Sequence, residues 1–142
     1  MLRIERSNPR DVERLCRFDP MARRDAARRV MLMSWARQGQ VEIGLVGDSI
    51  VGFAVLTRSF FHQPFIELLM IGETYRRQGY GRALVEHCVA AVPVGVKLWT
   101  STNESNASMR ALLAVAGFIA SGRVDNLDPG DPELVFVHLP GA

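Results

Sequence analysis

Hydrophobic positions recur at helical spacing in the first 40 residues of the chain. Asn8-Pro9 and Asp19-Pro20 each place a capping residue before a proline at the first helical position, which is typical of a helix start. The first helix is expected to bury Val12, Leu15 and Cys16. The second, from Pro20 to about Gln38, is expected to bury Ala22, Ala26, Val30 and Met33 and to stop at Gly39.

The hydrophobic period changes to two after Val41, which predicts strands. Residues 41–46 alternate, Gly47-Asp48 is a turn signal, and residues 50–56 are rich in β-branched and apolar side chains. We therefore expect a hairpin, followed by a loop that holds Phe60, Phe61, His62 and Pro64. Residues 65–71 are apolar on both faces except at Glu67, as in a central strand.

The second half of the chain alternates helices with strands. A glycine-rich loop over residues 72–82 leads into a helix that includes Tyr80 and ends at Pro93, and residues 94–100 are expected to form a buried strand. Residues 103–108 supply caps for a further helix, which is expected to bury Met109, Leu112, Leu113 and Ala116 and to close at Gly117. Two final strands, 118–124 and 133–139, flank an acidic connection. One α/β domain over residues 1–142 is the simplest architecture.

Composition narrows the class of protein. The chain has 142 residues, 48% hydrophobic and 23% charged, as expected for a domain with a packed core. No apolar run approaches the roughly 20 residues that cross a bilayer, and the N-terminus lacks the apolar segment of a secretory signal. We therefore expect a cytoplasmic protein without membrane contact. The two cysteines and three scattered histidines form no metal-ligand pattern, so no metal is expected.

Charge is distributed unevenly along the chain. Residues 1–40 hold ten arginines against five acidic residues, a net charge of +5, whereas residues 41–142 carry −3. Such a basic segment could bind an anionic ligand or RNA. Arg23, Arg24, Arg28 and Arg29 also fit the solvated outer face of one helix. Aromatic residues are not interleaved with these arginines, so nucleic acid is not expected as a partner.

The glycine-rich loop is the segment with the clearest binding chemistry. Gly79 and Gly81 lie where a strand turns into a helix, so the free amides of the first helical turn can converge on an anion. Arg76, Arg77 and Arg82 add positive charge, which suits a pyrophosphate. The loop lacks the Gly-Lys-Ser/Thr ending of a P-loop and the third glycine of a dinucleotide fingerprint. By physics alone, it could equally be a tight turn.

The run Arg76-Arg77-Gln78-Gly79-Tyr80-Gly81 resembles the R/Q-x-x-G-x-G/A loop of the GNAT (Gcn5-related) N-acetyltransferase superfamily. The preceding apolar strand, Asn106 and the Gly117-Phe118 pair follow in the same order, and the resemblance is strongest over residues 64–118. It implies an α/β (α+β) GNAT fold: a mixed, mostly antiparallel sheet of six or seven strands flanked by about four helices. The sheet would be splayed near the Glu67 strand, where the pantetheine arm of the coenzyme inserts.

The resemblance also implies acetyl-CoA as cofactor and assigns residues to it. The backbone amides of Arg77 to Arg82 would bind the pyrophosphate, Leu69 and Ile71 would pair with the pantetheine arm, and Asn106 would touch the coenzyme from the other side. The full set of coenzyme-binding residues implied in this way is Leu69, Met70, Ile71, Arg76, Arg77, Gln78, Gly79, Tyr80, Gly81, Arg82, Asn103 and Asn106.

The expected reaction is direct attack of a primary amine on the acetyl thioester in a ternary complex. Glu67 is the candidate base, because desolvation in an apolar strand strengthens a carboxylate as a base. Alternatively, Glu67 faces solvent or pairs with an arginine. Many relatives have a tyrosine as general acid where this chain has Leu113. Ser108 could substitute, water could protonate the thiolate, or the chain could be an acyl-CoA-binding regulatory module without turnover.

The acceptor is less well specified than the coenzyme. His62 and Phe61 lie in a segment where the family commonly builds its acceptor pocket, and Trp35 could line it, although a helical tryptophan is more often core and a loop histidine more often surface. A small molecule and a peptide both remain open as acceptors. Many relatives dimerise through terminal strands, so a homodimer also remains open.

Overall fold

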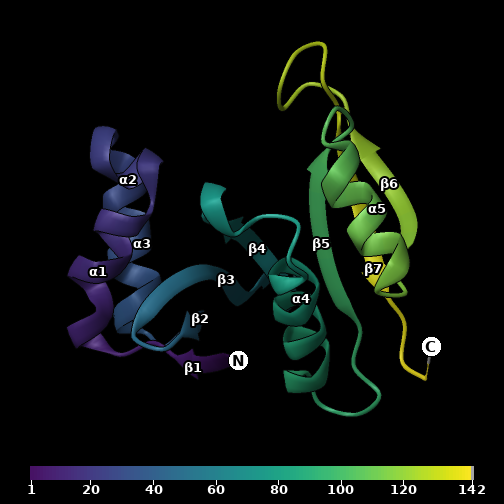
Figure 1. The fold of residues 1–142 in the computed structure, drawn as a ribbon. Coiled ribbons are helices and arrows are strands. Elements are labelled where there is room, and N and C mark those ends of the chain that lie inside the picture. The colour runs from purple at the N-terminus through teal and green to yellow at the C-terminus, as the bar shows by residue number, and fades with distance from the viewer. Residues whose placement is uncertain (142) are drawn as a thin grey trace. The chain divides into compact units, whose positions relative to one another are not determined.

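The computed structural model describes residues 1–141 and contains seven strands, five α-helices and two short 3-10 helices over that range. In chain order these are β1 (Leu2–Arg6), η1 (Pro9–Asp11), α1 (Val12–Phe18), α2 (Pro20–Arg24), α3 (Ala26–Arg37), β2 (Val41–Val46), β3 (Ser49–Phe60), β4 (Gln63–Ile71), η2 (Glu73–Tyr75), α4 (Tyr80–Ala91), β5 (Leu98–Asn103), α5 (Ala107–Val115), β6 (Ile119–Val124) and β7 (Glu133–His138). The strand order is β1-β2-β3-β4-β5-β7-β6, with β4 and β5 parallel and the pairs β1–β2, β2–β3, β5–β7 and β6–β7 antiparallel (Figure 1). The expected α/β class with a mixed sheet is confirmed.

The chain divides into two compact units that share β3, β4 and α4. The first unit contains residues 1–56 and 68–84, and the second contains residues 57–67 and the described residues from Val85 onward. The first unit therefore holds α1, α2, α3 and the glycine-rich loop. The second unit holds the tip of the β3–β4 hairpin, β5, α5, β6 and β7.

The expected first helix starts as the 3-10 helix η1, which Asn8 caps, and continues as α1 only from Val12. The second expected helix is broken in two. The backbone leaves the helical region at Asp25, whose φ of −133° and ψ of 111° separate α2 from α3. The Asp25 side chain accepts hydrogen bonds from the amides of Ala27 and Arg28, so it caps a new helix start. The prediction of one continuous helix from Pro20 to Gln38 was therefore wrong. Its end was correct, since Gly39 stops α3 with a φ of +70°.

The break changes which residues α3 buries. Ala26 and Val30, expected on the buried face, are exposed, and Val30 retains 66% of its accessible surface. Leu32 and Ala36 are buried instead, in the core of the first unit, and Met33 packs against that core. Arg28 also departs from the expected solvated stripe, because its side chain is only 14% exposed beside the buried Asp19. A cap that restarts a helix changes which of the following positions face the core. One stripe of apolar positions therefore cannot describe both α2 and α3.

Three consecutive antiparallel strands complete the first unit. The hairpin of β2 and β3 around Gly47-Asp48 forms as predicted, and strand β1, which sequence reasoning did not place, pairs with β2 from Leu2 opposite Val46 to Arg6 opposite Glu42. The buried side of this sheet meets α1 and α3 through a core that includes Leu15, Leu32 and Phe53. The strand at Leu2 was missed because five residues with two apolar positions give a weak alternation signal.

The expected loop around Phe60 is instead a tight hairpin turn. β3 continues to Phe60 and β4 begins at Gln63, so that only Phe61 and His62 connect them. Their φ values of 51° and 65° place both residues in the left-handed region, where hairpin turns normally use asparagine or glycine. Without those residue types the sequence carried no turn signal, and the loop prediction was wrong.

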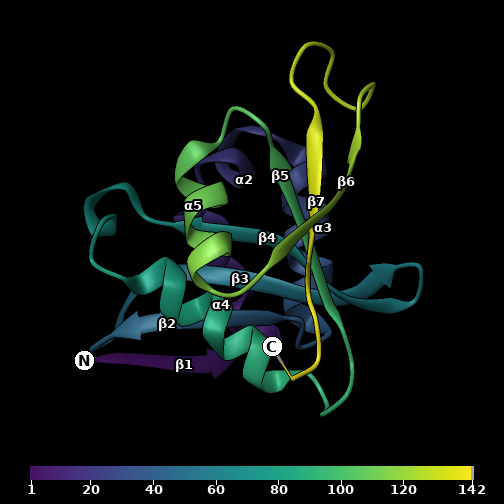
Figure 2. The ribbon, with the colours of Figure 1, turned by 90° about the vertical axis from the view of Figure 1, so that its right-hand side faces the viewer.

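In the second unit, β5 lies between β4 and β7. Its parallel pairing with β4 covers Phe65 opposite Trp99 and Ile66 opposite Thr100, and its antiparallel pairing with β7 runs over all six of its residues. β6 pairs with the other side of β7 as the edge strand, and the connection between β6 and β7 projects beyond the ends of the strands (Figure 2). The strand expected over residues 94–100 starts only at Leu98, because Gly95 adopts a φ of +84° in a turn.

Helix α5 is close to its prediction. Asn106 caps it by accepting a hydrogen bond from the Met109 amide, and Gly117, with a φ of +91°, follows its end. Leu113 is the fully buried residue of this helix, whereas the other three residues expected on its inner face, Met109, Leu112 and Ala116, are partly exposed.

Candidate functional site

The end of β4 presents backbone groups along the edge of the first unit's sheet. The Gly72 amide donates to the Val51 carbonyl at 2.9 Å, so Gly72 and every second residue before it face β3. The intervening residues, Leu69 and Ile71, therefore direct their N–H and C=O groups away from β3. Within the first unit no strand pairs with that edge. It is suited to hydrogen-bond an extended, amide-containing ligand.

The loop after β4 bends sharply before it enters α4. Arg77 and Gly79 adopt positive φ values of 63° and 86°, and the Ala83 amide donates to the Gly79 carbonyl at 3.1 Å as the first hydrogen bond of the helix. The amides of Arg77, Gln78, Gly79, Tyr80 and Gly81 find no acceptor within the part of the chain that the structure describes. These are the orphan donors of a helix start and the turn that leads into it.

The space around this turn is open to a ligand. A Cβ placed on Gly79 would meet no protein atom within 4 Å. Arg76 and Gln78 turn back onto the preceding segment, where Arg76 Nε donates to the Ile71 carbonyl at 3.4 Å and Gln78 Nε2 to the Thr74 carbonyl at 3.3 Å. The Arg77 side chain is exposed. A turn with unpaired amides, a helix N-terminus and nearby guanidinium groups fits a phosphate or pyrophosphate group.

Glu67 sits in a small hydroxyl cluster of the second unit. Thr57 Oγ1 donates to Glu67 Oε1 at 3.1 Å, and Ser59 Oγ donates to the same oxygen. Thr57 is buried, whereas Glu67 is partly exposed and Ser59 is exposed. No arginine pairs with Glu67 among the described residues, so that alternative does not hold.

The two hydroxyl groups act on one oxygen and leave the other available. The two hydrogen bonds to Oε1 fix the orientation of the carboxylate. Glu67 Oε2 accepts no hydrogen bond from residues 1–141, so this oxygen is the one available to receive a proton. Sequence reasoning found Glu67 but missed Thr57 and Ser59. Their signal was the alternation of hydroxyl residues at the end of β3, which resembles an ordinary solvated strand face.

The residues around α5 are engaged in local hydrogen bonds. Asn106 Oδ1 caps the helix and also accepts from Ser108 Oγ at 3.3 Å, so Ser108 behaves as a first-turn residue. The Asn103 side chain donates to Asp128 Oδ2 at 3.0 Å and to the Asp131 carbonyl at 3.1 Å. Both amide hydrogens of Asn103 are therefore used to hold the acidic connection between β6 and β7.

The acceptor candidates occupy different parts of the fold. Trp35 is partly buried and packs against the core of the first unit. Phe61 and His62 form the hairpin turn of the second unit, where Phe61 is 80% exposed. Phe60 contacts Phe61, Phe65 and Trp99 with ring centroids 4.9 to 5.3 Å apart, which gives the hairpin tip an aromatic patch.

Metal-ligand clusters and membrane-spanning helices are both absent from the described residues. Among residues 1–141, no cluster of three or more histidine, cysteine, aspartate and glutamate side chains could hold a metal ion. None of the helices in the described range is long and apolar enough to cross a membrane.

A family model and a solved structure match this chain to the same family. The family model of the acetyltransferase (GNAT) family matches residues 4–118. A GNAT-family acetyltransferase from Bacillus cereus is 32% identical, with a TM-score of 0.89 over 100% of this chain and 99% of that one. No curated protein matches the sequence.

Two further solved structures share the fold at lower identity. Diaminobutyrate acetyltransferase from Paenibacillus lautus, in complex with L-2,4-diaminobutyric acid and coenzyme A, is 20% identical, with a TM-score of 0.77 over 99% of this chain and 95% of that one. The ribosomal-protein-S18-alanine N-acetyltransferase from Escherichia coli is also 20% identical, with a TM-score of 0.75 over 100% of this chain and 96% of that one.

Proposed function

The chain belongs to the acetyltransferase (GNAT) family, and on this premise we propose that it transfers an acetyl group from acetyl-CoA to a primary amine. The observation that carries the proposal is the run of amides from Arg77 to Gly81 that lack acceptors where β4 passes into α4. The proposal treats residues 1–142 as one acetyltransferase domain that acts in the cytoplasm.

The first unit supplies the groups proposed to hold the coenzyme. The amides that follow Arg76 would donate to the pyrophosphate, with Arg82 contributing positive charge at the start of α4. The outward-facing N–H and C=O groups of Leu69 and Ile71 would pair with the pantetheine arm, with Met70 between them. Asn106 is proposed as a coenzyme contact on the family resemblance alone. Asn103 is the weakest member of the set, because its amide hydrogens are already used.

Acetyl-CoA, when bound, supplies an acetyl group activated as a thioester. The acceptor amine must be neutral to form a bond to the acetyl carbon, yet an amine with a pKa near 10 is mostly protonated at neutral pH. We assign Glu67 as the base. Its Oε2 accepts the proton from the amine, while the hydroxyl groups of Thr57 and Ser59 hydrogen-bond to Oε1. Thr57 and Ser59 are positioning residues in this scheme.

The departure of the coenzyme thiolate needs no acid from position 113. Leu113 is fully buried in α5 and cannot donate a proton. A thiolate is a far better leaving group than an amine, so it can depart unaided and take a proton from water. Ser108 remains an alternative donor, although its hydroxyl is hydrogen-bonded to Asn106.

The acceptor class is a primary amine on a small molecule or a peptide. The fold of this chain is shared by acetyltransferases named for a diamino acid and for a protein N-terminal alanine, so the fold accommodates both kinds of acceptor. Trp35, Phe61 and His62 are the proposed acceptor contacts. The exposed edge of β6 is compatible with a homodimer. A measurement of the oligomeric state in solution tests it.

A second candidate function is favoured by Leu113 alone. A chain that binds acyl-CoA but lacks a general acid could serve as a regulatory module without turnover. The two candidates are separated by measuring thiol release from acetyl-CoA in the presence of a panel of primary amines, with the Gly81→Trp variant as control. Acceptor-dependent release in the wild type, absent in Gly81→Trp, supports the enzyme. Coenzyme binding without release from any amine supports the module.

A further inference from the structure

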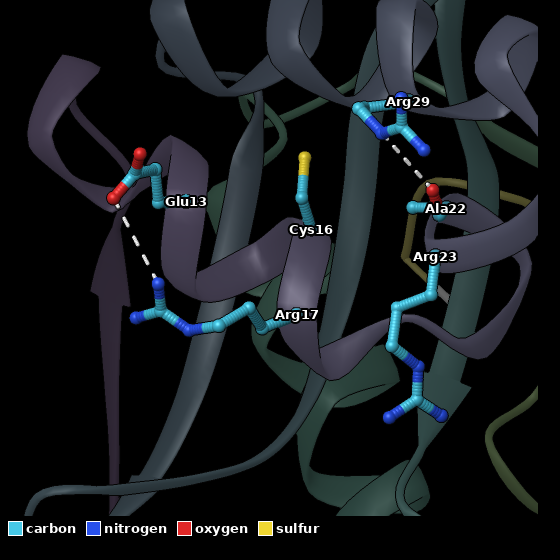
Figure 3. Close-up of a pocket in the computed structure, with 6 residues that line it drawn as sticks. All are labelled: Glu13, Cys16, Arg17, Ala22, Arg23 and Arg29. Carbon is cyan, nitrogen blue, oxygen red and sulfur yellow. Dashed lines mark hydrogen bonds and ion pairs between the residues drawn. The ribbon is translucent and has the colours of Figure 1, made fainter.

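An open pocket lies at the corner where α1, α2 and α3 meet in the first unit, and no step of the proposed reaction uses it. Its volume is about 290 Å³, and six residues line it: Glu13, Cys16, Arg17, Ala22, Arg23 and Arg29. Figure 3 shows Cys16 in the middle of the lining, with Glu13 and Arg17 on one side and Ala22, Arg23 and Arg29 on the other. All six residues belong to the arginine-rich segment whose role the sequence left open.

The walls of this pocket are held in place by a buried ion pair. Asp19 is fully buried between α1 and α2, where Oδ1 caps α2 by accepting from the Met21 amide at 3.0 Å. Its other oxygen, Oδ2, lies 3.1 Å from Nε of Arg28 on α3. One carboxylate thus fixes the junction of α1 with α2 and ties it to α3. The pocket is therefore preformed, and a ligand would not have to order it.

The charge around the pocket is positive. Three arginines and one glutamate line it, and only Arg17 is compensated, with Nη1 3.7 Å from Glu13 Oε2. Arg29 Nε donates to the Ala22 carbonyl at 3.2 Å, which orients the guanidinium and leaves its terminal nitrogens available. The Arg23 guanidinium has no hydrogen-bond or ion-pair partner within residues 1–141.

The floor of the pocket is apolar. Ala22 is fully buried, and Cys16 is partly buried. Burial raises the pKa of the Cys16 thiol, an effect that the nearby Arg29 charge opposes only in part. The thiol is therefore neutral at physiological pH and carries no negative charge that would offset the positive charge of the arginines.

We propose that this corner is a binding site for a small oxyanion, a carboxylate or phosphate compound with a short apolar portion. The oxyanion would lie at the Arg29 guanidinium, near Cys16, because a guanidinium group matches carboxylate and phosphate oxygens. Arg23 points away from Arg29 and would add only positive charge at the rim of the pocket (Figure 3). The apolar portion would rest on Ala22 and Cys16. A pocket of this volume is near the lower limit for small-molecule sites, so it suits a free small anion rather than a nucleic-acid strand. The proposed acetyl transfer uses none of the residues that line this site.

Cys16 provides a local reporter for the experiment. The rate of its alkylation by iodoacetamide is measured by mass spectrometry on the full chain, with inorganic phosphate or butyrate added and ionic strength held constant with sodium chloride. Cys88, which is fully buried, serves as the internal reference, and Cys16→Ser identifies the modified site. Arg29→Ala removes the proposed ligand, and Arg23→Ala removes a neighbouring positive charge. Arg24→Ala is the matched control, because Arg24 is an exposed neighbour in α2 that does not line the pocket.

Bound anion should slow alkylation of Cys16 in a saturable manner in the wild type and in Arg24→Ala. In Arg29→Ala the concentration that gives half-maximal protection should rise about tenfold or more, as expected for the loss of one charge-assisted hydrogen bond. In Arg23→Ala it should rise by less, because only a neighbouring positive charge is lost. Protection by phosphate alone or by butyrate alone would decide which oxyanion the site accepts. Absence of protection by both anions, or equal weakening in all three arginine variants, would overturn the proposal. Protection by RNA oligonucleotides but by neither small anion would also overturn it.

Discussion

The Glu67→Gln substitution removes the proposed base and changes little else. The amide oxygen that replaces the carboxylate can still accept hydrogen bonds from Thr57 and Ser59, and the side chain keeps its size. The variant therefore isolates the loss of a proton acceptor from the loss of structure. Its free energy of unfolding should stay within about 1 kcal/mol of the wild type, because the hydroxyl contacts persist.

The expected size of the kinetic effect follows from the protonation of the acceptor. For an amine with a pKa near 10, the neutral fraction is roughly one in a thousand at pH 7 and roughly one in ten at pH 9. A positioned base contributes about 10² to 10⁴ in rate. Glu67→Gln should therefore lower kcat/KM by about a hundredfold or more at pH 7. The deficit should shrink to about tenfold or less at pH 9, where free amine is available without a base.

The assay is acceptor-dependent thiol release over pH 6 to pH 10, with an active amine from the panel and circular dichroism at each pH as the folding control. Thr57→Val is the companion variant. It removes one of the two hydroxyl groups that orient the Glu67 carboxylate, so kcat/KM should fall, but by less than in Glu67→Gln. A Glu67→Gln profile parallel to that of the wild type would refute the assignment of Glu67 as the base.

Three further predictions concern stability and reactivity. Arg28→Ala leaves the buried Asp19 carboxylate without a counter-charge and should cost about 3–5 kcal/mol in urea denaturation; a loss below about 1 kcal/mol would contradict this account of the helix corner. Asn106→Ala removes the α5 cap and should cost about 1 kcal/mol, whereas Asn106→Asp should retain most of it; equal losses in both would be inconsistent with a capping role. Because burial raises the pKa of the Cys16 thiol, its alkylation at pH 8 should be slower than that of free cysteine and should continue to rise above pH 9; a plateau below pH 8 would show that the thiolate is stabilised instead.

The parts of the fold that the sequence predicted are those where local signals and tertiary structure agree. The Gly47-Asp48 turn, the stop at Gly39 and the entry to α4 each depend on a residue type that only one local conformation suits. The errors fall where such a signal was absent or ambiguous. The helix expected from Pro20 to about Gln38 ran through Asp25, although an aspartate can equally cap a new helix start. Phe61 and His62 adopt a turn that their side chains do not favour.

The same distinction separates the parts of the candidate site that the sequence revealed from those that it did not. The turn proposed to bind the coenzyme could be found in the sequence because glycines and arginines stand close together there, and Arg77 and Gly79 adopt positive φ values in it. The hydroxyl cluster on Glu67 was not readable, because it joins two strands and depends on which hydroxyls reach one oxygen. Contacts between strands follow from register, which a short polar alternation does not fix.

The measurement that tests the central claim most directly is isothermal titration calorimetry of acetyl-CoA and free coenzyme A into the folded wild type and into Gly81→Trp. We predict saturable binding of both to the wild type, and none to a Gly81→Trp protein whose circular dichroism is unchanged, because the indole would fill the space over the amides that follow Arg76. Failure of the folded wild type to bind either form of the coenzyme would contradict the account, as would normal affinity in folded Gly81→Trp.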